Sequence, residues 1–219
     1  MTERPTPAKI LIVDDHPMIR EGLSLRISTQ KDLQVCGQAA SEEEAIQLVQ
    51  ETQPRLVLID LSLKNSNGID LIKQIKSRFP AVNMLVFSGF HESLYAERAL
   101  RAGALGYVNK QESDEKVIEA IHTVLEGKRY VSSEITQKLI DQALGTTDAT
   151  KSPIERLTDR ELEILHMIGE GLTSSTIANR LFLSTHTIDT HRENIKRKLN
   201  VKNSGELVRT AVQWVLETG

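Results

Sequence analysis

Asp60 is the residue of this sequence that is best placed to react. It ends the apolar run Leu56–Ile59, which is typical of a strand buried on both faces of a parallel sheet. Turn-forming residues follow from Asn65 to Gly68, and a helical pattern comes next. Because open α/β sheets place their reactive groups beyond the carboxyl ends of the strands, Asp60 is the candidate for a reacting carboxylate.

Other polar side chains follow similar apolar runs: Asp14 and Asp15 after residues 9–13, Ser88 after residues 83–87, and Lys110 after residues 106–109. The carboxyl ends of parallel strands share one edge of a sheet, so we expect these four side chains to converge on Asp60. Three carboxylates in one place repel one another unless a cation offsets them, and hard oxygen ligands suit Mg²⁺. With a lysine and a hydroxyl beside them, this set is suited to phosphoryl transfer onto a carboxylate.

Each of these residues alone has a plainer explanation. An Asp pair after a strand is often a helix-capping turn, a serine at a strand end is often only a hydroxyl, and a lone lysine is often a solvated charge. Their occurrence together at successive strand ends favours the reactive site.

The elements that would position these residues form two domains. Apolar runs predict five strands at residues 9–13, 33–39, 56–59, 83–87 and 106–109, each followed by a helical pattern. This alternation predicts an α/β doubly wound five-stranded parallel sheet (flavodoxin-like) over residues 1–127. Residues 128–153 are expected to hold one more helix and a flexible linker at 145–152, and residues 154–219 a small all-α domain.

Composition and charge are compatible with this organisation. The chain has 219 residues with 39% hydrophobic residues, enough for two ordinary cores, and Cys36 is its single cysteine. One cysteine fits a reducing compartment, and neither a secretory signal nor an apolar run long enough for a membrane is present, so we expect a cytoplasmic protein. The net charge is −3, yet residues 192–202 contain five basic residues and one acidic residue. That local basic patch indicates nucleic acid as a partner.

The strings KILIVDDHP, LVLIDLSLKNSNGID, LVFSG and GYVNK resemble the receiver domain of two-component response regulators. The resemblance implies that Asp60 is the phosphoacceptor for a sensor histidine kinase and that the only phosphoryl chemistry is transfer to Asp60, without enzymatic turnover. It further implies roles for the surrounding residues: Asp15, Asp60 and the Ser62 carbonyl hold Mg²⁺, Asp14 assists through water, Ser88 and Lys110 bind phosphoryl oxygens, and Tyr107 is the switch aromatic. Tyr107 could also be a plain strand-edge aromatic.

Two positions depart from the receiver pattern. Lys64 and Gln111 stand where many receivers have proline. The loop after Asp60 is therefore expected to be less rigid. We expect a trans bond before Gln111, because a cis bond without proline costs about 3 kcal/mol.

The string LTDRELEILHMIGEGLTSSTIANRLFLSTHTIDTHRENIKRKLNV resembles the LuxR-type helix-turn-helix of the NarL/FixJ class. Residues 185–199 would be the recognition helix, with Ile188 and Ile195 facing the domain. The candidate DNA-binding residues are Ser184, His186, Thr187, Asp189, Thr190, Arg192, Glu193, Lys196, Arg197 and Lys198. Of these, Asp189 and Glu193 could accept from cytosine N4 and so serve selectivity. A solvated charged helix face is the alternative explanation.

The last helical pattern, residues 204–215, is too apolar for a single core face. By resemblance it contributes a dimer contact, for which Leu207, Ala211 and Trp214 are the candidates. Trp214 could instead close the small core. A two-fold dimer, formed when the protein is active, would require an inverted-repeat DNA site.

Two other functions remain open at this stage. A Mg²⁺-dependent phosphatase could use Asp60 as nucleophile, but it would need an acid two residues later, where Ser62 stands. A phosphorylation-independent DNA-binding protein with a vestigial receiver is the other alternative, and the complete set of strand-end residues argues against it.

Overall fold

The computed structural model describes residues 6–63, 66–144 and 153–218. The chain divides between Ile140 and Asp141 into two compact units, which are described separately below. Two predictions, the linker at residues 145–152 and the effect of Lys64, lie outside the described residues. Across the described residues, no helix is both long enough and apolar enough to cross a membrane.

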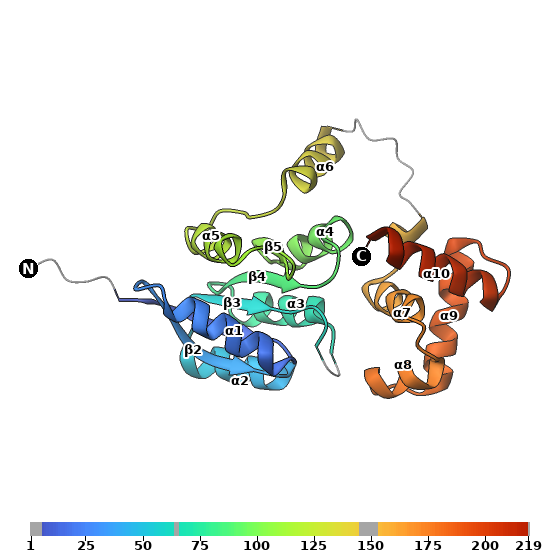
Figure 1. Ribbon diagram of the computed structural model, residues 1–219, viewed down its shortest axis with the longest axis horizontal. Helices are drawn as coiled ribbons and strands as arrows, with labels where there is room; N and C mark the ends of the chain where they lie inside the picture. Colours follow the sequence, from blue (N-terminus) through green and yellow to red (C-terminus); the bar gives the residue numbers. More distant parts are fainter. Residues whose placement is uncertain (1–5, 64–65, 145–152, 219) are drawn as a thin grey trace, which may run out of the picture. The chain divides into compact units, whose positions relative to one another are not determined.

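The first unit is built on a five-stranded sheet whose strands are all parallel, in the order β2-β1-β3-β4-β5 (Figure 1). The strands are β1 (Ala8–Val13), β2 (Leu33–Ala39), β3 (Leu56–Ile59), β4 (Asn83–Ser88) and β5 (Gly106–Asn109). The helices are α1 (Pro17–Ser28), α2 (Glu42–Thr52), α3 (Gly68–Arg78), α4 (Glu92–Ala102), α5 (Asp114–Leu125) and α6 (Ser133–Leu144). The predicted doubly wound sheet is therefore confirmed.

Both faces of the sheet are covered. One core cluster joins Ile10, Leu58 and Val108 of the strands to Leu23 of α1 and Ile121 of α5, so these two helices lie on the same face. The residues that alternate with them along the strands are also buried, under the helices α2, α3 and α4. All four residues of β3 are buried, as the continuous apolar run predicts.

Helix ends in the first unit follow local rules with one variation. Ser41 caps α2 by accepting from the Glu44 amide, whereas the Glu44 carboxylate reaches the amide of Ala40 instead of the amide of Ser41. Compared with a standard capping box, the second bond is thus shifted by one residue. All peptide bonds of the described residues are trans, including the bond before Gln111, as expected.

The second unit is helical. It contains the 3₁₀ turn η1 (Pro153–Arg156) and the helices α7 (Asp159–Gly169), α8 (Ser174–Leu181), α9 (Thr185–Leu199) and α10 (Ser204–Thr218). Thr158 and Glu161 form a capping box at the start of α7. The last helix continues to Thr218, three residues beyond its expected end.

The helices α7 and α10 approach each other backbone to backbone at Gly169. A Cβ atom at this position would lie 2.4 Å from Val215 Cγ2 and 2.6 Å from the carbonyl oxygen of Ala211. Only glycine allows this contact without a shift of one helix, so the relative position of the two helices is set at this residue.

Candidate phosphoryl-transfer site and DNA-binding helix

Asp60 lies just after β3, where the sheet ends. Its amide donates to the carbonyl of Val13 at 2.8 Å, which fixes its backbone against the end of β1. The chain then turns back so closely that a Cβ atom on Gly68 would lie 2.4 Å from the Asp60 carbonyl oxygen and 2.6 Å from Leu61 Cα. Glycine at the start of α3 is therefore required for this turn, and the turn holds Asp60 at the sheet edge.

Lys110 joins two of the carboxylates. Its Nζ lies 2.8 Å from Asp60 Oδ2 and 2.6 Å from Asp14 Oδ2, and the side chains of Asp14 and Asp60 are almost fully buried. The backbone amide of Lys110 donates to the carbonyl of Ser88 at 2.9 Å, so the pairing of β5 with β4 places the lysine. Convergence of Asp14, Asp60 and Lys110 on one edge follows from the parallel sheet.

Asp15 and His16 complete an acidic cluster. One possible ligand atom from each of Asp14, Asp15, His16 and Asp60 lies within 4.8 Å of the others. His16 Nδ1 is 2.7 Å from Asp15 Oδ1 and 3.2 Å from Asp14 Oδ1, and its backbone amide donates to Asp14 Oδ1 at 2.8 Å. His16 is not among the site residues predicted from the sequence, although its position beside two aspartates could have indicated a role in the cluster.

Burial and charge act in opposite directions on the reactive pair. Burial raises the pKa of Asp60, and Asp14 adds to this, while the Lys110 ammonium and the amide of Ser62 lower it; the net direction is upward. Burial alone would lower the pKa of Lys110, but Asp60 and Asp14 outweigh burial and raise it. Lys110 therefore carries its charge throughout the neutral range.

The donor set fits a divalent cation. Asp60 Oδ1 is buried and, among the described residues, accepts no hydrogen bond, while the Asp15 side chain keeps 9% of its surface exposed. A buried carboxylate oxygen without a partner is costly unless a cation or a water completes it. Carboxylate oxygens with room for water are the ligands that Mg²⁺ prefers. The Ser62 carbonyl remains a predicted ligand.

Ser88 and Tyr107 lie one step away from the carboxylates. Ser88 is fully buried at the end of β4, and its hydroxyl accepts the amide of Phe90 at 3.4 Å. Within the part of the chain that the structure describes, Ser88 makes no hydrogen bond to Asp60. Tyr107 is buried, with its hydroxyl donating to the carbonyl of Phe90 at 2.7 Å, and burial raises its pKa well above 10.0. Both residues thus meet at the loop between β4 and α4.

In the second unit, α9 has the form of a recognition helix. Ser184 caps it by accepting the amide of Thr187, and Ile188 and Ile195 are buried, as predicted. The structure places His186, Asp189, Thr190, Glu193 and Arg197 on the exposed side together with the cap Ser184, and leaves Thr187, Arg192, Lys196 and Lys198 partly covered.

The charged residues of α9 differ in how far they are engaged within the unit. Lys198 Nζ lies 2.5 Å from the buried Glu161 carboxylate of α7, so this residue is engaged within the unit, and its role as a DNA phosphate contact stays a prediction. Lys196 pairs with Glu193 at 2.7 Å, and Arg197 donates to Asn194. The exposed Asp189 makes no hydrogen bond or ion pair within the described part of the unit and is the acid best placed to read a base.

The apolar surface of α10 lies on a different side from the one predicted. Leu207, Ala211 and Trp214 are buried in the core of the second unit, so their prediction as surface contacts is corrected. Trp214 packs edge-on against His166, which matches the alternative of core closure. Val208, Val212 and Leu216 instead line an open apolar groove of about 390 Å³ together with Arg209 and Gln213, and Leu216 is 78% exposed.

Comparison with known families identifies both units. Residues 10–122 match the response regulator receiver domain, and residues 155–211 match the bacterial regulatory proteins of the luxR family. The oxygen regulatory protein NreC of Staphylococcus carnosus (strain TM300) is 35% identical over 210 residues, which are 94% of this chain and 97% of NreC. NreC of Staphylococcus aureus (strain MRSA252) is 36% identical with the same coverage.

Solved structures agree with this assignment. A LuxR-family two-component response regulator from Aurantimonas sp. SI85-9A1 is 34% identical, with a TM-score of 0.59, over 64% of this chain and 99% of that chain. The RcsB response regulator of Salmonella typhimurium is 24% identical, with a TM-score of 0.70, over 95% of this chain and 98% of RcsB. At this identity RcsB supports the fold alone.

Proposed function

The chain belongs to the response regulators that join a receiver domain to a LuxR-type DNA-binding domain, and on this premise we propose that Asp60 is its phosphoacceptor. Proteins of this family are phosphorylation-regulated transcription regulators. The observation that carries the proposal is the buried Asp60 carboxylate, held 2.8 Å from the Lys110 ammonium at the carboxyl edge of the sheet. We assign residues 1–127 to the receiver, 128–153 to a helix and linker, and 154–219 to DNA binding.

The reaction is an attack by an Asp60 carboxylate oxygen on the phosphorus of a phosphohistidine on a sensor histidine kinase. The phosphorus–nitrogen bond breaks as the acyl phosphate forms, and the chain performs no further turnover. Asp15, Asp60 and the Ser62 carbonyl, with Asp14 assisting through water, would hold Mg²⁺, and the ion would supply positive charge that offsets the charge of the phosphoryl group. Lys110 exchanges its contact with Asp60 Oδ2 for a phosphoryl oxygen, and its fixed charge offsets the charge of about −2 that the phosphate brings.

Ser88 completes the response in this proposal. Its hydroxyl turns from the Phe90 amide to a phosphoryl oxygen, so the loop between β4 and α4 loses one internal bond when Asp60 is phosphorylated. Tyr107, whose hydroxyl is bonded to the same loop, then changes its environment.

The output of the switch is binding of α9 in the major groove of double-stranded DNA. Ser184, His186, Thr187, Arg192, Lys196 and Arg197 contact phosphates and position the helix, whereas Asp189 and Thr190 face the base edges. A carboxylate only accepts hydrogen bonds, so Asp189 selects a cytosine or adenine amine in that groove. The ion pair between Glu193 and Lys196 orients Lys196 toward the DNA phosphates.

A phosphorylated homodimer on an inverted repeat is the proposed active form. The groove of Val208, Val212 and Leu216 on α10 is the contact between the two copies, because it is an open apolar surface in the unit that carries the recognition helix. The proposed location of the protein is the cytoplasm, where a kinase and DNA are both accessible.

The test compares Asp60→Asn with the wild type. We expect Asp60→Asn to take up no phosphate from acetyl phosphate, as measured by intact mass, and to lose the phosphodonor-dependent gain in affinity for DNA selected from genomic fragments. Asp70→Asn is the matched control, because Asp70 is an exposed acid of α3 that pairs with Lys73 of the same helix. Undiminished labelling of Asp60→Asn would reject the site, and a DNA affinity that ignores phosphorylation would reject the switch.

A further inference from the structure

Residues 128–132, which we call the strap, leave α5 and run beside β5 before α6 begins. Tyr130 forms a parallel bridge with Gly106, at the free edge of the sheet. Its carbonyl accepts the amide of Tyr107 at 2.8 Å, and its amide donates to the carbonyl of Leu105 at 3.0 Å. The strap is therefore hydrogen-bonded to the chain on both sides of Gly106, along β5, which carries the proposed switch residue Tyr107.

The sequence is adapted to this contact. A Cβ atom on Gly106 would lie 2.7 Å from the carbonyl oxygen of Tyr130 and 3.1 Å from its Cβ, so only glycine lets the strap approach this closely. The ring of Tyr130 packs against the core cluster shared by α1 and α5. The first anchor of the strap, at Tyr130, is thus held by the sheet edge and by the core of the first unit.

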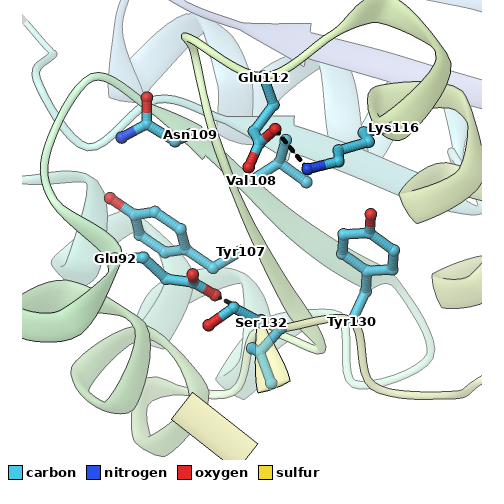
Figure 2. A pocket seen from close by; sticks show the side chains of 9 residues that line it. Glu92, Tyr107, Val108, Asn109, Glu112, Lys116, Tyr130 and Ser132 are labelled. Atoms are coloured by element: carbon cyan, nitrogen blue, oxygen red, sulfur yellow. Dashed lines mark hydrogen bonds and ion pairs between the residues drawn. The ribbon is translucent and has the colours of Figure 1, made fainter. Parts of the chain in front are cut away.

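A second anchor joins the strap to α4. Glu92 Oε1 accepts the backbone amide of Ser132 at 2.8 Å, as Figure 2 shows. Ser132 in turn caps α6, because its hydroxyl accepts the amide of Ile135 at 3.3 Å and its carbonyl accepts the amide of Thr136 at 3.0 Å. The carboxylate of α4 therefore holds the residue at which α6 starts.

These contacts are connected to the proposed phosphorylation site through a series of hydrogen bonds. The Ser88 hydroxyl accepts the Phe90 amide, the Phe90 carbonyl accepts the Tyr107 hydroxyl, and Glu92 lies two residues beyond Phe90. A cavity of about 110 Å³ lies between Glu92, Tyr107, Lys116, Tyr130 and Ser132 (Figure 2). This volume holds a few water molecules and gives the Glu92 and Tyr107 side chains room to change position.

We propose that the strap is the relay between Asp60 and α6, the helix that leads toward the DNA-binding unit. This inference rests on the proposed function. When Ser88 releases Phe90, the start of α4 shifts, Glu92 loses the amide of Ser132, and the first turn of α6 is freed while Tyr130 stays bonded to β5. In this proposal the Glu92–Ser132 hydrogen bond breaks on phosphorylation, and the bridge between Tyr130 and Gly106 stays intact.

The test is amide hydrogen exchange on the full chain, with and without acetyl phosphate and Mg²⁺. Phosphorylation should speed exchange at Ser132 and Thr136 by about tenfold or more, the loss expected for a hydrogen bond to a charged acceptor, with the amide of Tyr130 unchanged. Unphosphorylated Glu92→Ala should already exchange at the faster rate and show no further rise. Glu92→Gln, which keeps an acceptor oxygen, should restore most of the protection.

Glu97→Ala is the matched control, since Glu97 is another acid of α4 and pairs with Arg101 of the same helix. It should behave as the wild type. Intact mass on the same samples reports the phosphate on Asp60. Full labelling with unchanged exchange at Ser132 and Thr136 overturns the relay alone, as does wild-type exchange in Glu92→Ala. Absence of the phosphate mass overturns the proposed function, and the relay falls with it.

Discussion

The Lys110 ammonium pairs with two carboxylates in this structure and is also the group proposed to bind the phosphoryl oxygens. It lies between Asp14 and Asp60 at 2.6 and 2.8 Å, so one ammonium serves two carboxylates while Asp15 remains for other partners. Two negative charges remain in excess over this lysine in a mostly buried cluster, which favours the binding of a divalent cation.

Mg²⁺ should therefore stabilise the first unit. At about ten times its dissociation constant, Mg²⁺ should raise the melting temperature by roughly 4 °C, because a ligand that binds only the folded state adds about 1.4 kcal/mol. Differential scanning calorimetry of the chain with and without Mg²⁺ measures this. Asp15→Asn should lose most of the rise, and Asp70→Asn should keep it. An equal rise in Asp15→Asn would place the ion elsewhere.

The sequence was sufficient for the residues at the strand ends, because parallel strands bring their carboxyl ends to one edge whatever the loops do. The sequence did not indicate the ion pair of Lys198, since its partner Glu161 is far away in the chain and belongs to a helix cap. His16 was overlooked because its backbone role at a helix start concealed its side chain's position in the acidic cluster.

At the scale of elements, the turn between β3 and α3 depends on Gly68. Gly68→Ala should lower the free energy of unfolding by about 2 kcal/mol, because the added methyl group meets the backbone of Asp60 and Leu61. It should also slow phosphate uptake, since the same backbone carries the phosphoacceptor. Urea denaturation and phosphorylation rates measure the two effects.

Gly22→Ala is the control for that substitution. No atom lies within 4 Å of a Cβ at Gly22, which is inside α1, so alanine there should raise stability by about 0.5–1 kcal/mol. Equal stability changes at the two glycines would contradict the argument from close approach.

The contact between α7 and α10 predicts a pH dependence. Burial is the main cause that lowers the pKa of His166 below 6.5, with Arg180 adding to this and Glu170 opposing it. A histidine with a lowered pKa in the folded state contributes stability that is complete above pH 6.5 and is lost as the pH falls through the lowered value. The second unit should therefore lose stability below pH 6.5.

Trp214 is the single tryptophan of the chain and lies edge-on to His166 at 5.9 Å between ring centroids. Its fluorescence should fall as His166 becomes protonated, with a midpoint below pH 6.5, because a charged imidazole quenches indole more strongly. His166→Gln should remove the transition, and His186→Gln, at an exposed position, should keep it. A midpoint above 6.5 would contradict the direction of the shift.

The element boundaries could be predicted closely from the sequence because caps and apolar periods mark them, as at Thr158 and Glu161. Which face of α10 is buried could not be predicted from the sequence. Leu207, Ala211 and Trp214 point inward while Val208, Val212 and Leu216 line a groove, yet both sets are apolar and have helical spacing. Only the packing of α10 on α7 distinguishes them.

For the whole molecule, two copies on one DNA site should depend on the α10 groove. Leu216→Asp places a charge at a residue that is 78% exposed, so the monomer should fold normally. Affinity for an inverted repeat should fall at least tenfold, toward that of a single half-site, because a desolvated apolar contact is replaced by a charge. Fluorescence anisotropy and analytical ultracentrifugation measure this.

Leu25→Asp is the control, because Leu25 of α1 is 72% exposed and belongs to the first unit. It should leave the contact between recognition helices intact. Equal losses in both variants would show that the effect arises from added charge and not from the groove.

The glycine contact at residue 169 has a geometric consequence for operator choice. Because α10 packs closely on α7 at Gly169, and α9 packs on α7 as well, we expect the proposed pairing surface and the DNA-reading helix to keep a fixed relative position. The number of base pairs between two half-sites is then set by the packing at Gly169 within the second unit and does not depend on the first unit. An isolated copy of this unit should prefer the same operator spacing as the full chain.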